Sequence, residues 1–171
     1  MKDDFIKPVL VLTLICLVIS GALAVTNSIT EPIIADAAAD RAESAMYSAV
    51  PDASGFESLA TDGLPESIRE AYKSTNDAGY VFILRVGGYG GDIVLICGVA
   101  PDGSVLSCST LEHSETKGLG ARITEAQFEQ QFKGADSRLE GVDVISGATI
   151  SSSAYINAVK DALEAFRRIN G

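Results

Sequence analysis

The sequence predicts an α+β protein, in which a single N-terminal transmembrane helix precedes a small domain with a mostly antiparallel sheet and packed helices. Three observations carry this prediction. Residues 8–25 form an apolar run without a charge. Three segments rich in β-branched and apolar residues, 80–86, 93–99 and 105–111, follow one another across short turns. Residues 151–169 then place apolar side chains at helical spacing.

The composition excludes several classes of function. The chain carries a formal net charge of −10 at pH 7, whereas nucleic acids and anionic lipid surfaces require clustered Lys and Arg. We therefore expect no nucleic-acid partner. The single histidine and the three cysteines, Cys16, Cys97 and Cys108, have no metal-ligand spacing. We expect no metal site, and any redox chemistry would need a bound cofactor.

The apolar run has the length of a membrane anchor. At a rise of about 1.5 Å per residue, a helix at about residues 6–26 reaches across a hydrocarbon core of about 30 Å, so residues 1–30 are assigned as the anchor. The alternative is a cleaved signal peptide, because Ala22-Leu23-Ala24 resembles a small-residue cleavage site. The run exceeds the usual apolar length of about 7–15 residues in such peptides, which favours membrane retention.

The charges that flank the run predict its orientation. Lys2 and Lys7 precede it, and no Lys or Arg follows until Arg41. Because positively charged flanks stay on the cytoplasmic side, we expect a single-pass protein of the inner (cytoplasmic) membrane with its N-terminus in the cytoplasm. The main domain is then on the outer side.

The stretch between the anchor and the sheet, residues 31–79, is expected to be a helical connecting region. The membrane helix is expected to end at residues 27–32, and an Ala-rich helix is expected at residues 33–50. Residues 51–63 are rich in Gly, Ser and Asp and predict an irregular connection. Residues 65–72 predict a short helix.

The domain proper is expected at residues 80–171 and begins with a three-stranded meander. If Asp102-Gly103 forms a two-residue turn, Cys97 lies directly opposite Cys108. The face that they share is predicted to hold Leu95, Val99 and Leu106. Two buried thiols and a cross-strand disulfide both remain open, because an oxidising exterior permits the bond and its geometry is restrictive.

The second half of the domain predicts two helices and a short strand. Residues 124–127 (TEAQ) fit a capping box at the start of a short helix, with Phe128 and Phe132 on its apolar side. Residues 142–145 predict a short strand. The last helix is expected at residues 151–169.

The segment between that strand and the last helix, residues 143–149, is the first candidate site. Gly147 and Ala148 keep the turn thin, so that a bulky group can approach the backbone. Thr149 lies at the helix start, where unpaired N–H groups and the positive end of the helix dipole favour an anion. Two interpretations stay open: Thr149 and Ser151 cap the helix, or the helix start binds a phosphate.

The loop after the third strand is the second candidate. Its sequence, LEHSETKGLG, places two glycines around one leucine and exposes backbone groups suited to lining a flat ring. For His113 and Glu115 the alternative is an ordinary surface loop. The Gly-rich turn at residues 87–91 is no dinucleotide fingerprint, because it lacks the G-x-G-x-x-G order and leads into a strand. Tyr89 in this turn either covers a ligand or is an ordinary packed or exposed side chain.

Three stretches together resemble a known family: GYGGDI at residues 88–93, HSETKGLG at 113–120 and DVISGATIS at 143–151. They are similar, in this order and in these strand and helix contexts, to the FMN-binding G subunit of the Rnf ion-translocating ferredoxin:NAD+ oxidoreductase complex. The related C subunit of the Na+-translocating NADH:quinone reductase shares the domain. With the N-terminal helix, the resemblance covers essentially the whole chain.

The resemblance implies a covalent cofactor. In proteins with this pattern the final threonine, here Thr149, is esterified to the phosphate of FMN. A Mg2+-dependent flavin transferase makes the bond from FAD and releases AMP. The segment that the transferase recognises matches Asp143, Ser146, Gly147, Ala148 and Thr149. The further cofactor-binding positions that the resemblance implies are Ser146, Gly147, Ala148, Glu115, Thr116, Gly118, Leu119 and Gly120.

Lys117 departs from the family pattern, which usually has proline at this position. Proline restricts the backbone of a loop, so the loop is expected to be less rigid here. A cation near the ring would stabilise a reduced, anionic flavin.

The function that the resemblance implies is electron relay. The chain is expected to be a covalently flavinylated, membrane-anchored electron-transfer subunit of an Rnf-type complex, which couples ferredoxin:NAD+ electron transfer to Na+ or H+ translocation. It contributes no catalytic residue, and the assembled complex with its other membrane and peripheral subunits is the translocase. The short chain favours this complex over a Na+-translocating quinone reductase. Two further interpretations stay open: a membrane-tethered non-redox binding or sensory module, and a flavin-bearing donor to an extracellular reductase.

Overall fold

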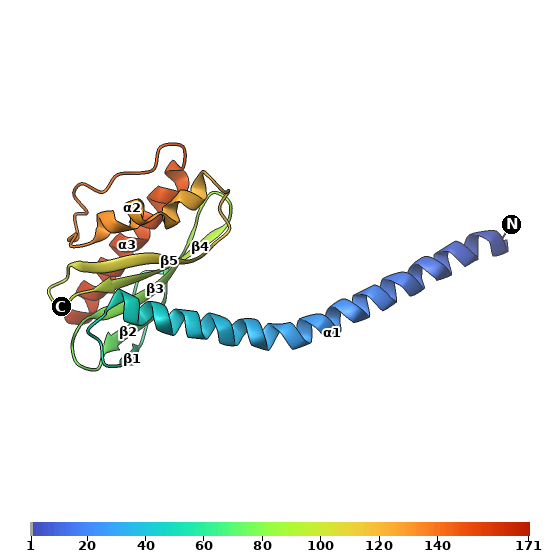
Figure 1. Ribbon diagram of the computed structural model, residues 1–171, viewed down its shortest axis with the longest axis horizontal. Helices are drawn as coiled ribbons and strands as arrows, with labels where there is room; N and C mark the ends of the chain where they lie inside the picture. Colours follow the sequence, from blue (N-terminus) through green and yellow to red (C-terminus); the bar gives the residue numbers. More distant parts are fainter. Residues whose placement is uncertain (1) are drawn as a thin grey trace. The chain divides into compact units, whose positions relative to one another are not determined.

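The computed structural model describes the backbone of residues 2–171 and the side chains of residues 9–31 and 41–171 (Figure 1). It has two compact units, Met1–Arg41 and Ala42–Gly171. The first unit contains most of the long helix α1 (Lys2–Ala49). The second unit contains the end of α1 and the other elements: β1 (Phe56–Leu59), β2 (Ile68–Ser74), β3 (Tyr80–Gly87), β4 (Asp92–Val99), β5 (Val105–His113), η1 (Gly120–Thr124), α2 (Ala126–Glu129), η2 (Gln130–Phe132) and α3 (Thr149–Asn170).

Helix α1 contains a segment that is long and apolar enough to cross a membrane. Its span Val9–Glu31 has a mean hydropathy of 2.7, and none of its side chains is buried. The predicted helix end at residues 27–32 is wrong, because α1 continues to Ala49. Ser28 and Thr30 donate their hydroxyl hydrogens to carbonyl oxygens of the preceding turn, which satisfies these polar side chains within a continuing helix.

Five antiparallel strands form one sheet in the order β1-β2-β3-β4-β5, so each strand pairs with the next along the chain. The predicted meander is confirmed as β3, β4 and β5. The helix predicted at residues 65–72 is wrong, and β2 lies there. Likewise, β1 lies within the connection predicted at residues 51–63. Ile68 and Ala71 of β2 are buried in the core, and its backbone pairs with β3, so tertiary pairing overrides local propensity.

Alternating side chains give the sheet two buried faces, and the α+β class is confirmed. Phe82 is on the face that packs against α3, which crosses the sheet in Figure 1. Val81 and Ile83 point to the opposite face and pack against Ala49 at the end of α1. Gly98 of β4 permits this contact, because a Cβ there would overlap the carbonyl oxygen of Ala49.

The structure confirms that Cys97 of β4 lies directly opposite Cys108 of β5. Both thiols are free and buried. Leu95 shares their face, as predicted. The turn between the strands is longer than two residues and the register shifts just before Val99. Leu106 therefore packs on the opposite face, and its predicted position was wrong.

The segment after β5 forms one turn of α-helix between two 3-10 helices. The capping box predicted at residues 124–127 is wrong. The Thr124 hydroxyl donates to the carbonyl of Ala121, and no side chain caps α2. Phe128 and Phe132 are buried as predicted, and both rings contact the buried Tyr155 of α3.

The strand predicted at residues 142–145 is wrong, because these residues are irregular. Two of their backbone amides donate to side chains, whereas a strand would pair them with the backbone of another strand. The amide N–H of Asp143 donates to the Gln131 side-chain oxygen at 2.9 Å. The amide N–H of Ile145 donates to the Ser152 hydroxyl oxygen at 3.1 Å. These two bonds hold the segment against η2 and α3. The last helix is confirmed and begins two residues earlier than predicted.

Candidate functional site

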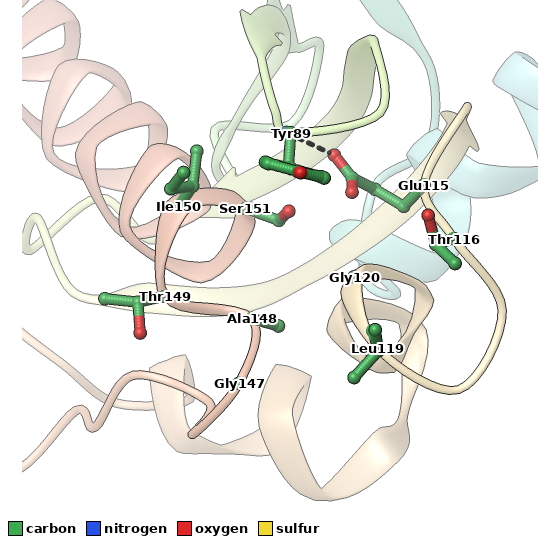
Figure 2. Close-up of a pocket in the computed structure, with 10 residues that line it drawn as sticks. All are labelled: Tyr89, Glu115, Thr116, Leu119, Gly120, Gly147, Ala148, Thr149, Ile150 and Ser151. Carbon is green, nitrogen blue, oxygen red and sulfur yellow. Dashed lines mark hydrogen bonds between the residues drawn. The ribbon is translucent and has the colours of Figure 1, made fainter.

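A pocket of about 400 Å³ opens where the β3–β4 turn, the loop after β5 and the start of α3 meet (Figure 2). This volume is within the range of small-molecule sites, about 300–1,000 Å³. Each of the three parts comes from one of the three stretches that carry the family resemblance. Ten residues line the pocket: Tyr89, Glu115, Thr116, Leu119, Gly120, Gly147, Ala148, Thr149, Ile150 and Ser151.

Glu115 joins two walls of the pocket. Its side chain is 7% exposed. Its Oε1 accepts hydrogen bonds from the amide N–H of Tyr89 at 2.8 Å and from that of Gly90 at 3.2 Å. The surface-loop interpretation is therefore wrong for Glu115. His113 is exposed, and its Nδ1 accepts the amide N–H of Glu115 at 3.1 Å.

Two glycines leave the space that the Glu115 carboxylate fills. A Cβ added to Gly88 would overlap Oε1 of this carboxylate, and a Cβ added to Gly120 would overlap Oε2. Gly88 belongs to the β3–β4 turn and Gly120 begins η1. One glycine from each of the first two resemblance stretches is thus needed to make room for one buried carboxylate.

The turn into α3 depends on Gly147 and Ser152. Gly147 has a φ of +83°, a left-handed conformation that side chains disfavour. The Ser152 hydroxyl accepts the amide N–H of Ile145 and donates to the carbonyl of Ala148 at 2.8 Å. The interpretation of Thr149 and Ser151 as caps is therefore wrong, since α3 has no side-chain N-cap bond.

The first turn of α3 presents unpaired backbone donors to the pocket. Within the described residues, no acceptor binds the amide N–H groups of Thr149, Ile150 and Ser151. Such N–H groups at the positive end of a helix dipole favour an anion. Thr149 itself is exposed, so its hydroxyl is accessible to a reacting group.

Two polar atoms in the pocket walls are buried without a hydrogen-bond partner in the described part of the chain: Glu115 Oε2 and Ser151 Oγ. Figure 2 shows both side chains pointing toward the space beside the ring of Tyr89. A buried polar atom without a partner costs about 1–3 kcal/mol. A bound molecule with matching polar groups would remove this cost, so the pocket fits a ligand with polar edges.

Most of the predicted cofactor-binding residues come together here. Ser146 and Gly118 do not line the pocket, and neither does Lys117, which is exposed. Asp143 and Ser146 are exposed on the segment that leads to the pocket. The predicted residues that do line it are Glu115, Thr116, Leu119, Gly120, Gly147, Ala148 and Thr149.

Three lining residues are additional to those predictions. Tyr89 is 74% exposed and lines the pocket, so it is accessible to cover a ligand. Ser151 was assigned only as a possible cap, although its place in the first turn of α3 signals a position near any anion bound there. No sequence feature indicated that Ile150 lines the pocket, because the residue after a helix start is usually exposed to solvent.

The arrangement suits a flat molecule with a phosphate group. The helix start offers amide donors for the phosphate, and Tyr89, Leu119 and Ile150 offer apolar surface. Glu115 and Ser151 offer the two buried polar atoms. No Lys or Arg is among the described residues that line the pocket, so a phosphate would depend on backbone amides.

Comparisons with known proteins agree with this geometry. Residues 88–164 match the family model of the FMN-binding domain. The chain shares the fold of the crystal structure of Shewanella oneidensis NqrC, with a TM-score of 0.50 and 20% identity over 59% of this chain and 60% of that one.

Two curated relatives match over nearly their whole length. One is the G subunit of the proton-translocating ferredoxin:NAD(+) oxidoreductase complex of Clostridium ljungdahlii, 32% identical over 170 residues, or 94% of this chain and 90% of that protein. The other is the G subunit of the ion-translocating oxidoreductase complex of Methanosarcina acetivorans, 33% identical over 178 residues, or 95% of each. This chain therefore belongs to the family of G subunits of ion-translocating oxidoreductase complexes.

Proposed function

We propose that this protein is a covalently flavinylated, membrane-anchored electron-transfer subunit of an Rnf-type complex that couples ferredoxin:NAD+ electron transfer to Na+ or H+ translocation. Family membership supports the complex. The flavin site is supported by one observation on the pocket wall: Glu115 Oε2 and Ser151 Oγ are buried without a hydrogen-bond partner within the described residues. The unpaired backbone amides of the first turn of α3 belong to the same wall.

Thr149 is the proposed attachment point. Its hydroxyl oxygen forms a bond to the FMN phosphorus of FAD, the pyrophosphate bond breaks, AMP leaves, and the hydroxyl proton passes to solvent or to a base of the transferase. Asp143, Ser146 and Gly147 are exposed, which supports their recognition by a Mg2+-dependent flavin transferase. Ala148 is buried and keeps the turn small.

The remaining pocket residues position the cofactor. Bound FMN would supply one- and two-electron redox chemistry that the side chains lack. The amides at the start of α3 hold the phosphate ester. Glu115 and Ser151 bind polar atoms of the ring system, and Leu119 with the Gly120 backbone forms the wall.

The membrane helix is proposed to hold the domain beside the other subunits. The apolar span Val9–Glu31 supports a single-pass anchor, and the positive residues Lys2 and Lys7 support a cytoplasmic N-terminus. Anchoring raises the effective concentration of redox partners around the flavin.

The attachment is tested by denaturing electrophoresis of protein from cells that contain the flavin transferase. The wild-type band should fluoresce under ultraviolet light, and Thr149→Ala should lose the fluorescence. Thr124→Ala is the matched control, because Thr124 is exposed and lies outside the pocket. A dark wild-type band would overturn the covalent flavin site.

The orientation is tested by labelling cysteines in intact cells with a membrane-impermeant maleimide. Asp62→Cys, placed in a Cys16→Ser background, should be labelled, because Asp62 is exposed in the main unit. Asp3→Cys in the same background should be labelled only after lysis. The opposite result would place the domain in the cytoplasm. Co-purification of partner subunits from the same cells identifies the complex.

A further inference from the structure

Cys97 and Cys108 form a buried pair in the middle of the sheet. Cys97 of β4 and Cys108 of β5 are directly opposite one another, and their sulfur atoms are 2.9 Å apart. The exposed fractions of the two residues are 0% and 4%. No group of three or more metal-ligating side chains occurs in the part of the chain that the structure describes, so the pair is not part of such a cluster.

We propose that Cys97 and Cys108 are a thiol/disulfide couple, which closes a cross-strand disulfide when the protein meets an oxidant that is itself a disulfide. In the first step the Cys108 thiolate attacks the oxidant, whose S–S bond breaks to release one thiolate. In the second step Cys97 attacks Cys108 within the mixed disulfide and releases the other. One S–S bond forms in the protein, and two electrons and two protons pass to the oxidant.

Cys108 is the residue that reacts first, because of its place in the sheet. β5 is an edge strand, whereas β4 lies between β3 and β5. Cys97 is therefore enclosed by paired strands on both sides. An oxidant reaches Cys108 when the outer edge of β5 opens.

Glu129 of α2 controls this opening. Its Oε1 accepts the amide N–H of Thr110 at 2.7 Å and the Thr110 hydroxyl at 3.1 Å, so it covers the free edge of β5 two residues from Cys108. Burial also raises the pKa of the Cys108 thiol. Since the thiolate is the nucleophile, the closed pair reacts slowly, and opening at the edge sets the rate.

The disulfide would act on the part of the sheet that supports the pocket. β5 continues from Cys108 to its end at His113, two residues before the pocket residue Glu115. A covalent bond from β5 to β4 prevents the edge strand from separating. The oxidised form is therefore expected to keep the Glu115 loop in place at temperatures at which the reduced form loses it.

The test counts thiols in the full-length Cys16→Ser protein in detergent, in which Cys97 and Cys108 are the remaining cysteines. The protein is incubated with oxidised glutathione, unfolded, alkylated with iodoacetamide and weighed. The proposal expects a mass lower by two hydrogens than that of the unalkylated reduced chain, with no alkyl group added. The unfolding temperature should rise on oxidation. Two alkyl groups, or a stable glutathione adduct, would overturn the proposal.

Two variants in the same background separate the steps. Cys97→Ser keeps the first nucleophile and loses the second, so it should stop at a mixed disulfide with glutathione on Cys108. Glu129→Ala removes the acceptor of the Thr110 amide and hydroxyl, so it should close the disulfide faster than the parent. An unchanged rate in Glu129→Ala would show that access does not run through the edge of β5. All of these measurements are independent of flavin content.

Discussion

Glu115 Oε1 and the amide nitrogen of Tyr89 are 2.8 Å apart, although 26 residues separate them in sequence. This bond fixes the loop after β5 against the β3–β4 turn. A carboxylate that accepts hydrogen bonds from two backbone amides holds them more strongly than a neutral acceptor would. Since these bonds join two walls of the pocket, the distance between the walls depends on the charge of one side chain.

Replacement of Glu115 by Gln tests this link. Glutamine is neutral, so the amides of Tyr89 and Gly90 would donate to an oxygen without a negative charge. Its NH₂ group, which replaces the other carboxylate oxygen, cannot accept a hydrogen bond. We expect Glu115→Gln to lower the free energy of unfolding by about 1–3 kcal/mol and to reduce flavin attachment. Urea denaturation in detergent measures the first effect and in-gel fluorescence the second. Glu112→Gln is the control, since Glu112 is exposed. Equal stability of the two variants would contradict this account.

Replacement of Gly120 by Ala tests the space beside the carboxylate. The added Cβ would overlap Oε2 of Glu115, so the side chain must move and the bond to Tyr89 must lengthen. Hydrogen exchange at the Tyr89 amide should become faster. Gly87→Ala is the control, because a Cβ there has open space. If Tyr89 keeps its protection in Gly120→Ala, the loop adjusts without loss of the link.

Ser152 is predicted to be the residue that holds the Gly147 turn. Ser152→Ala removes the acceptor of the Ile145 amide, and loss of comparable helix-start bonds costs about 0.5–2 kcal/mol. Unfolding by urea should show this loss, and the rate of flavin attachment should fall with it. Ser153→Ala is the neighbouring control, because Ser153 is less buried than Ser152 and lies outside the pocket. Equal attachment rates in the two variants would show that the turn keeps its shape without Ser152.

The stability of the domain should depend on the protonation of Glu129. Burial raises the pKa of Glu129 above its ordinary value of 4.5, although hydrogen bonds from Thr110 oppose the shift. The folded state therefore holds this proton more tightly than the unfolded state. The resulting stabilisation is complete below pH 4.5 and is lost as the pH rises through the folded-state pKa. Because glutamine does not titrate, the unfolding free energy of the wild type should fall relative to that of Glu129→Gln over that interval. A difference independent of pH would contradict the raised pKa.

The strands rich in β-branched residues could be predicted from the sequence, and so could the last helix. Each is long and has the periodicity of its class. β2 could not, because its charged and small residues favour a helix locally, and only its pairing with β3 decides otherwise. Leu106 was misplaced for a related reason: the register shift before Val99 depends on the length of the turn.

The parts of the candidate site that lie within one short motif could be predicted from the sequence. The contacts between motifs that are far apart in the sequence could not. A helix start after a thin turn left a cap and a phosphate site both open, and the family resemblance then pointed to Gly147, Ala148 and Thr149. The burial of Glu115 does not follow from its own loop, because its partners belong to the turn at Tyr89 and Gly90. A charged residue between two polar ones gives no local sign of burial.

The single charge among the described residues that line the pocket, that of Glu115, has a consequence for selectivity against dissolved nucleotides. Without a cation, the site would attract free mononucleotides or inorganic phosphate only through the amides at the helix start, whose partial charge is about half of that of a Lys or Arg side chain. Such molecules would compete poorly for the space. Under the proposed function, a bond made once by an enzyme would give permanent occupancy, and neither dilution nor a change in ionic strength would remove the cofactor.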